Sequence, residues 1–370
     1  YQITPTMRAS ADFAVGRLTQ DAAFLAPTLN AALAPSVPAL ARASLDGRVD
    51  TFNSNVRLSA APMADLRINA VYSRNVRDNK TALNSYPLIA TDIFLDSATR
   101  QNTPFDLTQD RVKVNADYRG FEGIKLSTGA DLDWRSRPYH EVVRTREAGV
   151  WGKVGMQVGE KLGLAFKLAK ASRDHSTYGT ATWFGAAENP LLRKYNLAKR
   201  DRDTAGVRAD VAATDTISLG LAVDYNNDAY AESIVGLKNA RSVNIGADLS
   251  AALTEKTQLT AFWQSERSRS LQAGSQFGPT ADWRALGDDR FNVLGLGITH
   301  TMLADKLKLG ADLTLSRAKS DLSVDTSYAQ PQFPQASTSQ DSFKVYANYK
   351  LGASLWLNGS LWHERYSASD

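Results

Sequence analysis

The chain has 370 residues, 43% of them hydrophobic, and its 43 basic and 39 acidic residues give a net charge of +4. No run of about 18 apolar residues occurs, which excludes helical membrane spans but not a membrane barrel, whose strands place only every second residue on lipid. The charges are interspersed, so no nucleic-acid-binding stripe is expected. The absence of cysteine excludes disulfides, thiolate sites and CxxCH haem attachment.

Alternation of apolar with polar residues predicts a long series of β-strands. In the cleanest case Ile217, Leu219, Leu221, Val223 and Tyr225 alternate with small or polar residues. In chain order the pattern marks 66–73, 111–119, 125–135, 162–169, 205–212, 217–226, 242–251, 257–266, 307–316, 343–350 and 355–362. Less regular copies lie at 51–60, 150–158 and 291–300, and a fifteenth strand is expected near 3–16.

The connections between these strands alternate between short and long. Short turns are expected at 61–65, 121–124, 159–161, 214–216, 253–256, 302–306 and 351–354. Long connections rich in Asn, Asp, Ser, Gly and Pro are expected over 77–110, 136–149, 173–203, 228–241, 268–290 and 318–341. This layout is typical of a transmembrane antiparallel up-and-down β-barrel, with one domain over residues 1–370 and about 14–15 strands.

The apolar face of each strand is expected to contact lipid. The strands read as nine to eleven residues, long enough to cross a bilayer when tilted, whereas strands of a soluble β-sandwich are nearer five or six. The opposite face carries many charges, and burying them unpaired in a sandwich core would cost several kcal/mol each. Aromatic residues near strand ends are typical of interfacial girdles: Tyr72, Tyr118, Trp134, Trp151, Tyr225 and Tyr349.

A membrane-spanning sheet must close on itself because open edges would leave backbone groups unsatisfied in hydrocarbon. The chain starts at Tyr1 without Met and ends in "HERYSASD", which reads as another loop. We therefore expect this chain to be a segment of a larger barrel, with terminal strands missing.

The sequence shows no catalytic or metal-binding motif. The four histidines, His140, His175, His300 and His363, are widely spaced, and each is read as a loop or girdle residue. The "DDR" stretch at 288–290 could bind calcium, but no EF-hand or repeat pattern supports it. A barrel enzyme using His140 or His175 with loop carboxylates is the least favoured alternative, and we expect no enzymatic activity.

The polar face mixes both signs of charge within single strands. Its candidates for contact with a partner inside the barrel are Arg67, Lys113, Asp117, Asp131, Asp133, Arg135, Arg208, Asp210, Lys308 and Asp312. Such a wall is compatible with water, as in a diffusion porin, and equally with a docked protein held by scattered hydrogen bonds and ion pairs.

Several segments resemble the MtrB/PioB family of outer-membrane barrels. They are "SLDGRVDTFNSNVRLSAAPMADLRINAVYS" (44–73), "RDNKT" (77–81), "RPYHEVVRTREAGVWGKVG" (137–155) and "NPLLRKYNLAKRDRDTAGVRADV" (189–211). The resemblance covers essentially the whole chain, through loop and strand signatures of moderate specificity.

The resemblance implies a barrel in the Gram-negative outer membrane that sheathes a periplasmic decahaem c-type cytochrome and insulates its electron path. The barrel would bind no cofactor, haem c being carried by the cytochrome, and an extracellular multihaem cytochrome is a further implied partner. The alternative is a general diffusion porin. The sequence departs from the family pattern in two ways, and both are expected if this chain is a segment of a larger barrel. The CxxC common near the family's mature N-terminus is absent, and the strand count falls short of the family's barrel.

Overall fold

The computed structural model describes residues 1–370 except 91–92, 180–187, 277, 327–330 and 370. The strands are β1 (Gln2–Thr4), β2 (Met7–Gln20), β3 (Gly47–Met63), β4 (Leu66–Asn79), β5 (Ser85–Ala90), β6 (Phe94–Gln101), β7 (Leu107–Phe121), β8 (Ile124–Ser136), β9 (Arg144–Val158), β10 (Leu162–His175), β11 (Leu192–Arg193), β12 (Arg200–Thr214), β13 (Ile217–Ala229), β14 (Val235–Thr254), β15 (Thr257–Gly274), β16 (Trp283–Met302), β17 (Leu307–Thr326), β18 (Ala336–Lys350) and β19 (Trp356–Ser369). One 3₁₀ turn, η1, spans Ala34–Ser36. No helix in the described part is long and apolar enough to cross a membrane.

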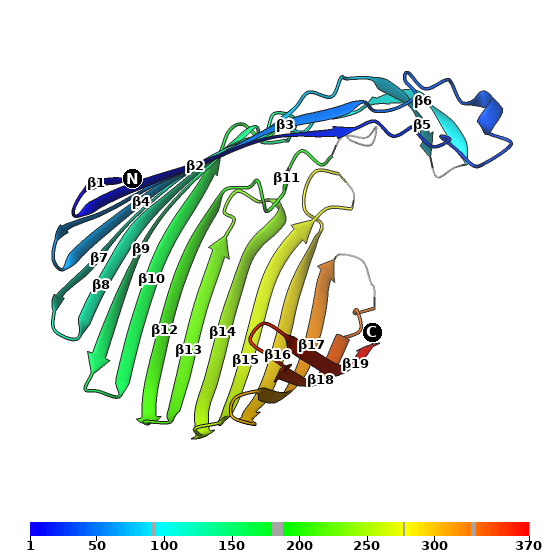
Figure 1. The fold of residues 1–370 in the computed structure, drawn as a ribbon. Coiled ribbons are helices and arrows are strands. Elements are labelled where there is room, and N and C mark those ends of the chain that lie inside the picture. The colour runs from blue at the N-terminus through cyan, green and yellow to red at the C-terminus, as the bar shows by residue number, and fades with distance from the viewer. Residues whose placement is uncertain (91–92, 180–187, 277, 327–330, 370) are drawn as a thin grey trace. The chain divides into compact units, whose positions relative to one another are not determined.

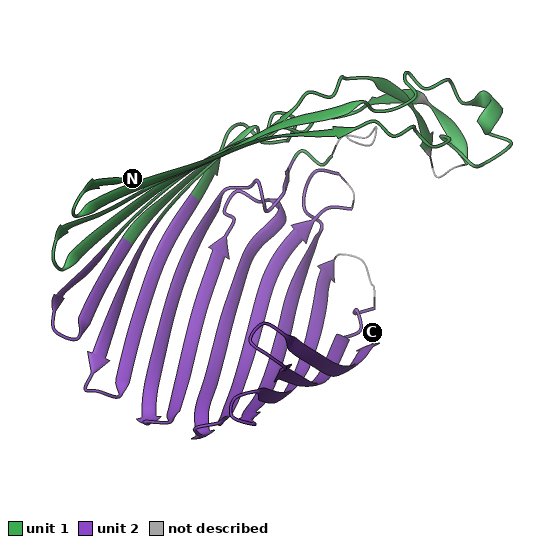
Figure 2. Cartoon of the chain, viewed as in Figure 1, with its two compact units in different colours: residues 1–116, 129–149, 173–190 green, residues 117–128, 150–172, 191–370 purple. Residues whose placement is uncertain are grey.

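Seventeen strands belong to one hydrogen-bonded sheet, and β5 and β6 pair separately as a hairpin (Figure 1). The chain divides into two compact units (Figure 2). Unit 1 comprises residues 1–116, 129–149 and 173–190, and unit 2 comprises 117–128, 150–172 and 191–370. Within unit 1, β2 to β4 pair antiparallel in sequence order, as do β12 to β19 within unit 2. The single barrel domain over 1–370 stays a prediction.

The predicted strand order and the alternation of turns are confirmed. Among the described residues, fifteen strands have 13 or more residues, in line with the expected 14–15. Adjacent strands are joined by tight turns at 64–65, 122–123, 159–161, 215–216, 255–256, 303–306 and 351–355, each within or beside its predicted range. The strand expected near 3–16 is β2, displaced toward the C-terminus and preceded by the short β1.

The predicted strand length of nine to eleven residues is wrong. The long strands run from 13 to 20 residues, and β14, β16 and β17 each have 20. Cross-strand pairing continues past the apolar stretch into segments where both faces of the strand carry polar residues. The connections predicted over 228–241 and 268–290 are therefore mostly strand; among the described residues, the loops are 230–234, 275–276 and 278–282.

The long connections of unit 1 differ from those predicted. The connection over 80–106 contains the β5–β6 hairpin, which the sequence did not indicate. The segment 21–46 joins β2 to β3 and contains η1, and it was not among the predicted long connections. Of the predicted connection over 173–203, residues 180–187 lie outside the described part of the chain.

In unit 2 the apolar residues of neighbouring strands share one exposed face. Leu221 on β13 lies between Ala209 of β12 and Ala247 of β14, and the same registers align the rest of the face. We call this face the apolar belt; it comprises Val207, Leu219, Leu221, Val223, Val243, Ile245, Trp263, Leu294, Leu296, Ile298, Leu309, Leu313 and Leu315. Its members are exposed or half-buried, and Leu221 is 58% exposed.

No sandwich core forms among the described residues. Their buried apolar side chains are few, and most are alanines or loop residues: Val142, Leu197, Ala198, Tyr230, Val235, Ala251, Ala273 and Ala285. The leucines and valines of the strands contact no second layer, so the soluble β-sandwich reading is wrong. Two girdle assignments near strand ends are also wrong. Trp151 lies at the centre of β9, where it alternates with the exposed Val150, and Tyr72 lies at the centre of β4.

Just after Pro190, the chain forms the short strand β11, which joins the sheet in unit 2. β11 pairs in parallel with the start of β14, with Leu192 opposite Val235 and Arg193 opposite Gly236. Gly236 has φ +120°, and a Cβ there would lie 2.4 Å from the Arg193 backbone oxygen. Only glycine permits both this backbone conformation and this approach.

Replacing Gly236 with alanine is therefore expected to detach β11 from β14, at a cost of about 1–3 kcal/mol for the strained backbone. Amide hydrogen exchange would report it as lost protection at Val235, whose N–H donates to the Leu191 carbonyl. Gly246→Ala on the same strand is the control, because its added Cβ would meet nothing nearer than 4.0 Å. Equal protection in the two variants would contradict the assignment.

Candidate functional site

The candidate site is the polar face of the sheet, opposite the apolar residues. Strand alternation assigns the predicted partner-contacting residues to this face. On β12, Arg208 and Asp210 alternate with Val207 and Ala209, and on β17, Asp312 alternates with Leu313. In unit 1, Arg67 of β4 likewise alternates with Ile68.

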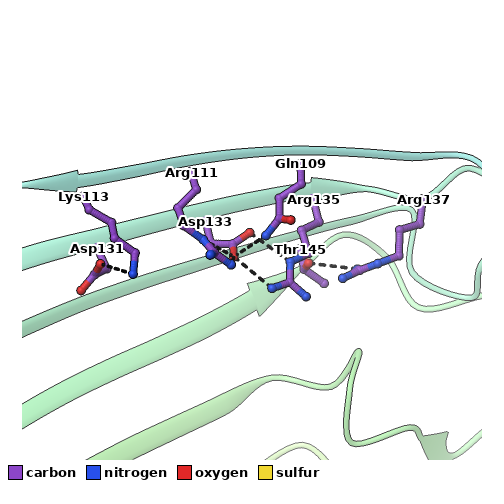
Figure 3. Close-up of polar contacts among 8 residues, drawn as sticks. All are labelled: Gln109, Arg111, Lys113, Asp131, Asp133, Arg135, Arg137 and Thr145. Atoms are coloured by element: carbon purple, nitrogen blue, oxygen red, sulfur yellow. Dashed lines mark hydrogen bonds and ion pairs between the residues drawn. The ribbon is translucent and has the colours of Figure 1, made fainter. Parts of the chain in front are cut away.

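Asp133 is the centre of the densest polar cluster of the site, on β8 in unit 1 (Figure 3). Arg135 donates from Nε to Asp133 Oδ1 and from Nη2 to Oδ2, both at 3.0 Å. From β7, Arg111 Nη2 and Gln109 Nε2 each donate to Oδ2 at 2.8 Å. The Asp133 side chain is only 17% exposed, so one half-buried carboxylate is shared by two guanidinium groups.

Two weaker contacts flank this cluster (Figure 3). Lys113 Nζ lies 3.6 Å from Asp131 Oδ1, and both side chains are largely exposed. Arg137, in the loop after β8, donates to Thr145 Oγ1 at 3.1 Å. Burial lowers the pKa of Arg137, and the neighbouring Arg135 charge lowers it further. The polar contacts of this face therefore range from a tight ion cluster to pairs that are open to solvent.

The predicted residues of unit 2 form two further clusters. Asp117 accepts from Ser127 Oγ at 2.6 Å and pairs with Lys125 Nζ at 3.0 Å. Arg208 Nη2 lies 2.7 Å from Asp210 Oδ1 and 3.3 Å from Asp248 Oδ1 of β14. In this second cluster two exposed carboxylates share one guanidinium, so acceptor capacity remains for an incoming partner.

Three predicted residues are not brought into such clusters. Within the described part of the chain, Arg67, Lys308 and Asp312 form no ion pair within 4.0 Å. Asp312 lies opposite Lys344 of β18 in the strand register.

Gln109, Arg111, Lys125, Ser127 and Asp248 were not among the predicted partner-contacting residues. Each alternates correctly onto the polar face, so that signal was available. Their pairing with Asp133, Asp117 and Arg208 depends on strand register, which the alternation alone does not give.

The histidines lie apart from this face or at its margins. His140 is in the loop between β8 and β9, with its ring 5.1 Å from that of Phe105. His175 ends β10, and its Nδ1 lies 2.6 Å from the Ser176 carbonyl oxygen. His300 Nδ1 lies 2.9 Å from Thr257 Oγ1, and His363 is exposed on β19. No group of three metal-ligating side chains occurs among the residues that the structure describes.

The calcium reading of 288–290 does not match the geometry. Asp288 and Asp289 are consecutive in β16 and point to opposite faces, so their carboxylates do not converge. Asp288 accepts from Arg267 and Arg269, whereas Asp289 accepts from Ser320.

Comparison with known proteins places the chain among outer-membrane barrels. Residues 1–370 match the model of a family described as an outer membrane beta-barrel porin, MtrB/PioB. The chain belongs to the MtrB/PioB family.

The MtrB/PioB chain is 30% identical over 316 residues to the outer membrane protein MtrB of Shewanella baltica (strain OS185). The match covers 85% of this chain and 44% of that protein, so the chain spans less than half the length of its relative. Among solved structures, the FrpB iron transporter of Neisseria meningitidis in its apoprotein form aligns with a TM-score of 0.55 and 11% identity. That alignment covers 99% of this chain and 58% of FrpB and shows a shared fold.

The MtrB/PioB assignment confirms the predicted family, the membrane-barrel fold class and the outer-membrane location. The apolar belt accordingly faces lipid. The family is described as a porin and is not a known enzyme family.

Proposed function

We propose that this chain forms part of an outer-membrane barrel that sheathes a decahaem c-type cytochrome and insulates its electron path across the membrane. The polar face would line the enclosed space and contact the cytochrome, and the apolar belt would keep lipid away from it. The observation that carries the proposal is the polar face of unit 2, where the carboxylates of Asp210 and Asp248 are both more than half exposed and share Arg208.

A protein cargo requires a wall that can pair with charges of both signs. Exposed ion pairs contribute little to stability, so they can exchange partners at small cost when a protein surface docks. Wet interfaces of this kind carry roughly one hydrogen bond per 100–200 Å² and tolerate bridging water.

Haem would be carried by the cytochrome rather than by this chain. Thioether attachment of haem c requires cysteine, and the sequence contains none. The four histidines are dispersed over β8–β9, β10, β16 and β19, so they offer no facing pair within a shared cluster.

The protein purified from outer membranes is expected to carry stoichiometric haem-staining material. The double variant Asp210→Lys with Asp248→Lys should reduce the co-purified haem several-fold, because it turns an acidic patch of the wall basic. Asp215→Lys with Glu255→Lys is the matched control: it makes the same charge change in turns at the ends of the same strands. Haem that is absent from the wild-type preparation, or equal in both variants, would contradict the proposal.

A general diffusion porin is the second candidate, favoured by the description of the family. It predicts steady ion conductance when the purified protein is inserted into a planar bilayer, and no haem in the preparation. A sheath filled by a cytochrome predicts the reverse result for both measurements.

A further inference from the structure

Beyond the apolar belt, the outward face of unit 2 carries a concentration of positive charge. We call it the basic band; it comprises Arg241, Arg267, Arg269, Arg290, Arg317, Lys319 and Arg365, on β14 to β19. Strand registers place all seven on the same face as the belt. The band lies at the ends of the strands that carry the longer loops, such as 275–282, and not at the tight turns such as 255–256.

Three cations of the band are direct lateral neighbours. Arg267 pairs in register with Arg290, and Arg290 with Lys319. Like charges directly opposite each other across strands are destabilising unless a counter-charge lies beside them. The sheet spacing of about 4.8 Å places the three side chains within about 10 Å, a span that one phosphorylated headgroup can bridge.

The carboxylates on the same face do not neutralise the band. Asp288 accepts from Arg267, Arg269 and Arg290 at once, and Asp341 accepts from Arg317. The third carboxylate, Asp321, accepts instead from Gln335. Farther toward the loops on this face, Arg284 of β16 and Asp325 of β17 lie opposite each other in the register. Within the band itself, seven cations lie beside only Asp288, Asp321 and Asp341.

Three cations of the band have no carboxylate partner in the described structure. Arg241, Lys319 and Arg365 form no ion pair within 4.0 Å there. Their charge is available to a ligand.

The outward charges of unit 1 are arranged differently. Arg17 and Arg48 each lie 2.7 Å from Asp50, and Lys80 lies 2.7 Å from Asp78. Every one of these cations has a carboxylate at hydrogen-bonding distance. Within the described structure, the cations without a carboxylate partner, Arg241, Lys319 and Arg365, therefore distinguish the outward face of β14–β19 from these strand ends of unit 1.

The depth of the band matches the lipid headgroups. Arg241 is the next residue on its face after Val243, and Arg317 is the next after Leu315. Consecutive residues on one face of a strand are about 7 Å apart, so these guanidinium groups begin where the hydrocarbon-facing belt ends. Cations at this level attract anionic lipid headgroups.

We propose that the basic band binds a phosphorylated glycolipid of the outer leaflet, with the Arg267–Arg290–Lys319 row holding its phosphate groups. In outer-membrane barrels the longer loops are extracellular, so the band meets the outer leaflet. Guanidinium groups suit this ligand because their planar donors bind phosphate oxygens in a bidentate manner. The proposal does not depend on the cytochrome.

The test is binding of lipid A to the purified protein in detergent, followed by native mass spectrometry. Arg290→Gln with Lys319→Gln should weaken binding of diphosphorylated lipid A by roughly thirtyfold. The variant loses two cations, and each cation near an anionic surface strengthens binding by a similar factor of roughly five to six. Lys308→Gln with Lys344→Gln removes two cations from the opposite face and should stay within about twofold of wild type. The charge-conserving pair Arg290→Lys with Lys319→Arg should retain binding, which separates charge loss from misfolding.

Two further arms identify the source of the phosphate. Dephosphorylated lipid A should bind the wild-type protein as weakly as diphosphorylated lipid A binds the Gln variant. Millimolar inorganic phosphate should not displace diphosphorylated lipid A from the wild-type protein. Equal binding of lipid A by the Gln variant and wild type would overturn the proposal. Full displacement by inorganic phosphate would overturn it as well, because it would mark a simple anion site.

Discussion

Leu221→Arg is expected to destabilise the folded barrel in phospholipid vesicles by about 2–4 kcal/mol, the cost of an arginine facing lipid near the bilayer midplane. Leu221 is 58% exposed at the centre of the β13 part of the belt. Its lateral neighbours, Ala209 and Ala247, offer no carboxylate that could pair with the new charge. The free energy of unfolding is measured by reversible denaturant unfolding of the vesicle-inserted protein. The folded fraction is read from the heat-dependent shift in its electrophoretic mobility.

Ser218→Arg supplies the matched control. Ser218 is exposed on the same strand but on the polar face, so the same arginine should change stability by no more than about 0.5 kcal/mol. The comparison is decisive because both positions are exposed. In a water-soluble sheet the two substitutions would be equally tolerated, and that outcome would contradict the assignment of the apolar belt to lipid.

Strand alternation is sufficient to predict most of this fold because each long strand has one face in lipid and one in a polar space. The apolar half of β13, from Ile217 to Tyr225, is readable without any tertiary information, and the tight turn at 215–216 follows directly from it. Beyond Tyr225, polar residues occupy both faces, so the strand continues to Ala229 without a periodic signal. The strand lengths were underestimated for this reason.

Local sequence also could not indicate contacts that depend on distant segments. The parallel pairing of β11 with β14 joins Leu192 to Val235, and the flanking residues carry no strand pattern. Glycine at 236 was the available signal, but a glycine alone does not reveal which backbone approaches it.

The polar face was predicted at the level of residue type and not of partners. Asp133 and Arg135 were identified because they alternate within one strand, whereas Gln109 and Arg111 lie on the preceding strand. Their convergence depends on how β7 and β8 are aligned, which the turn between them fixes. The basic band was missed because Arg267, Arg290 and Lys319 look like ordinary solvated charges until the registers align them.

The Asp133 cluster provides the second large expected effect. Asp133→Ala should destabilise the protein by about 1–3 kcal/mol, because the guanidinium groups of Arg111 and Arg135 would lose their shared acceptor and repel each other. The side chain of Asp133 is 17% exposed, so solvent replaces the lost carboxylate only in part. Denaturant unfolding in phospholipid vesicles measures the change.

Asp131→Ala is the control for this effect, since it lies two residues away on the same face of β8. Asp131 is 41% exposed and has a single lysine at 3.6 Å, so its loss should cost no more than about 0.5 kcal/mol. Raising the salt concentration should reduce the difference in unfolding free energy between Asp133→Ala and Asp131→Ala only slightly. The reason is that salt screens a half-buried ion cluster less than an exposed pair. Equal stability of the two alanine variants would show that the polar face is uniformly solvated, with no rigid ion cluster at Asp133.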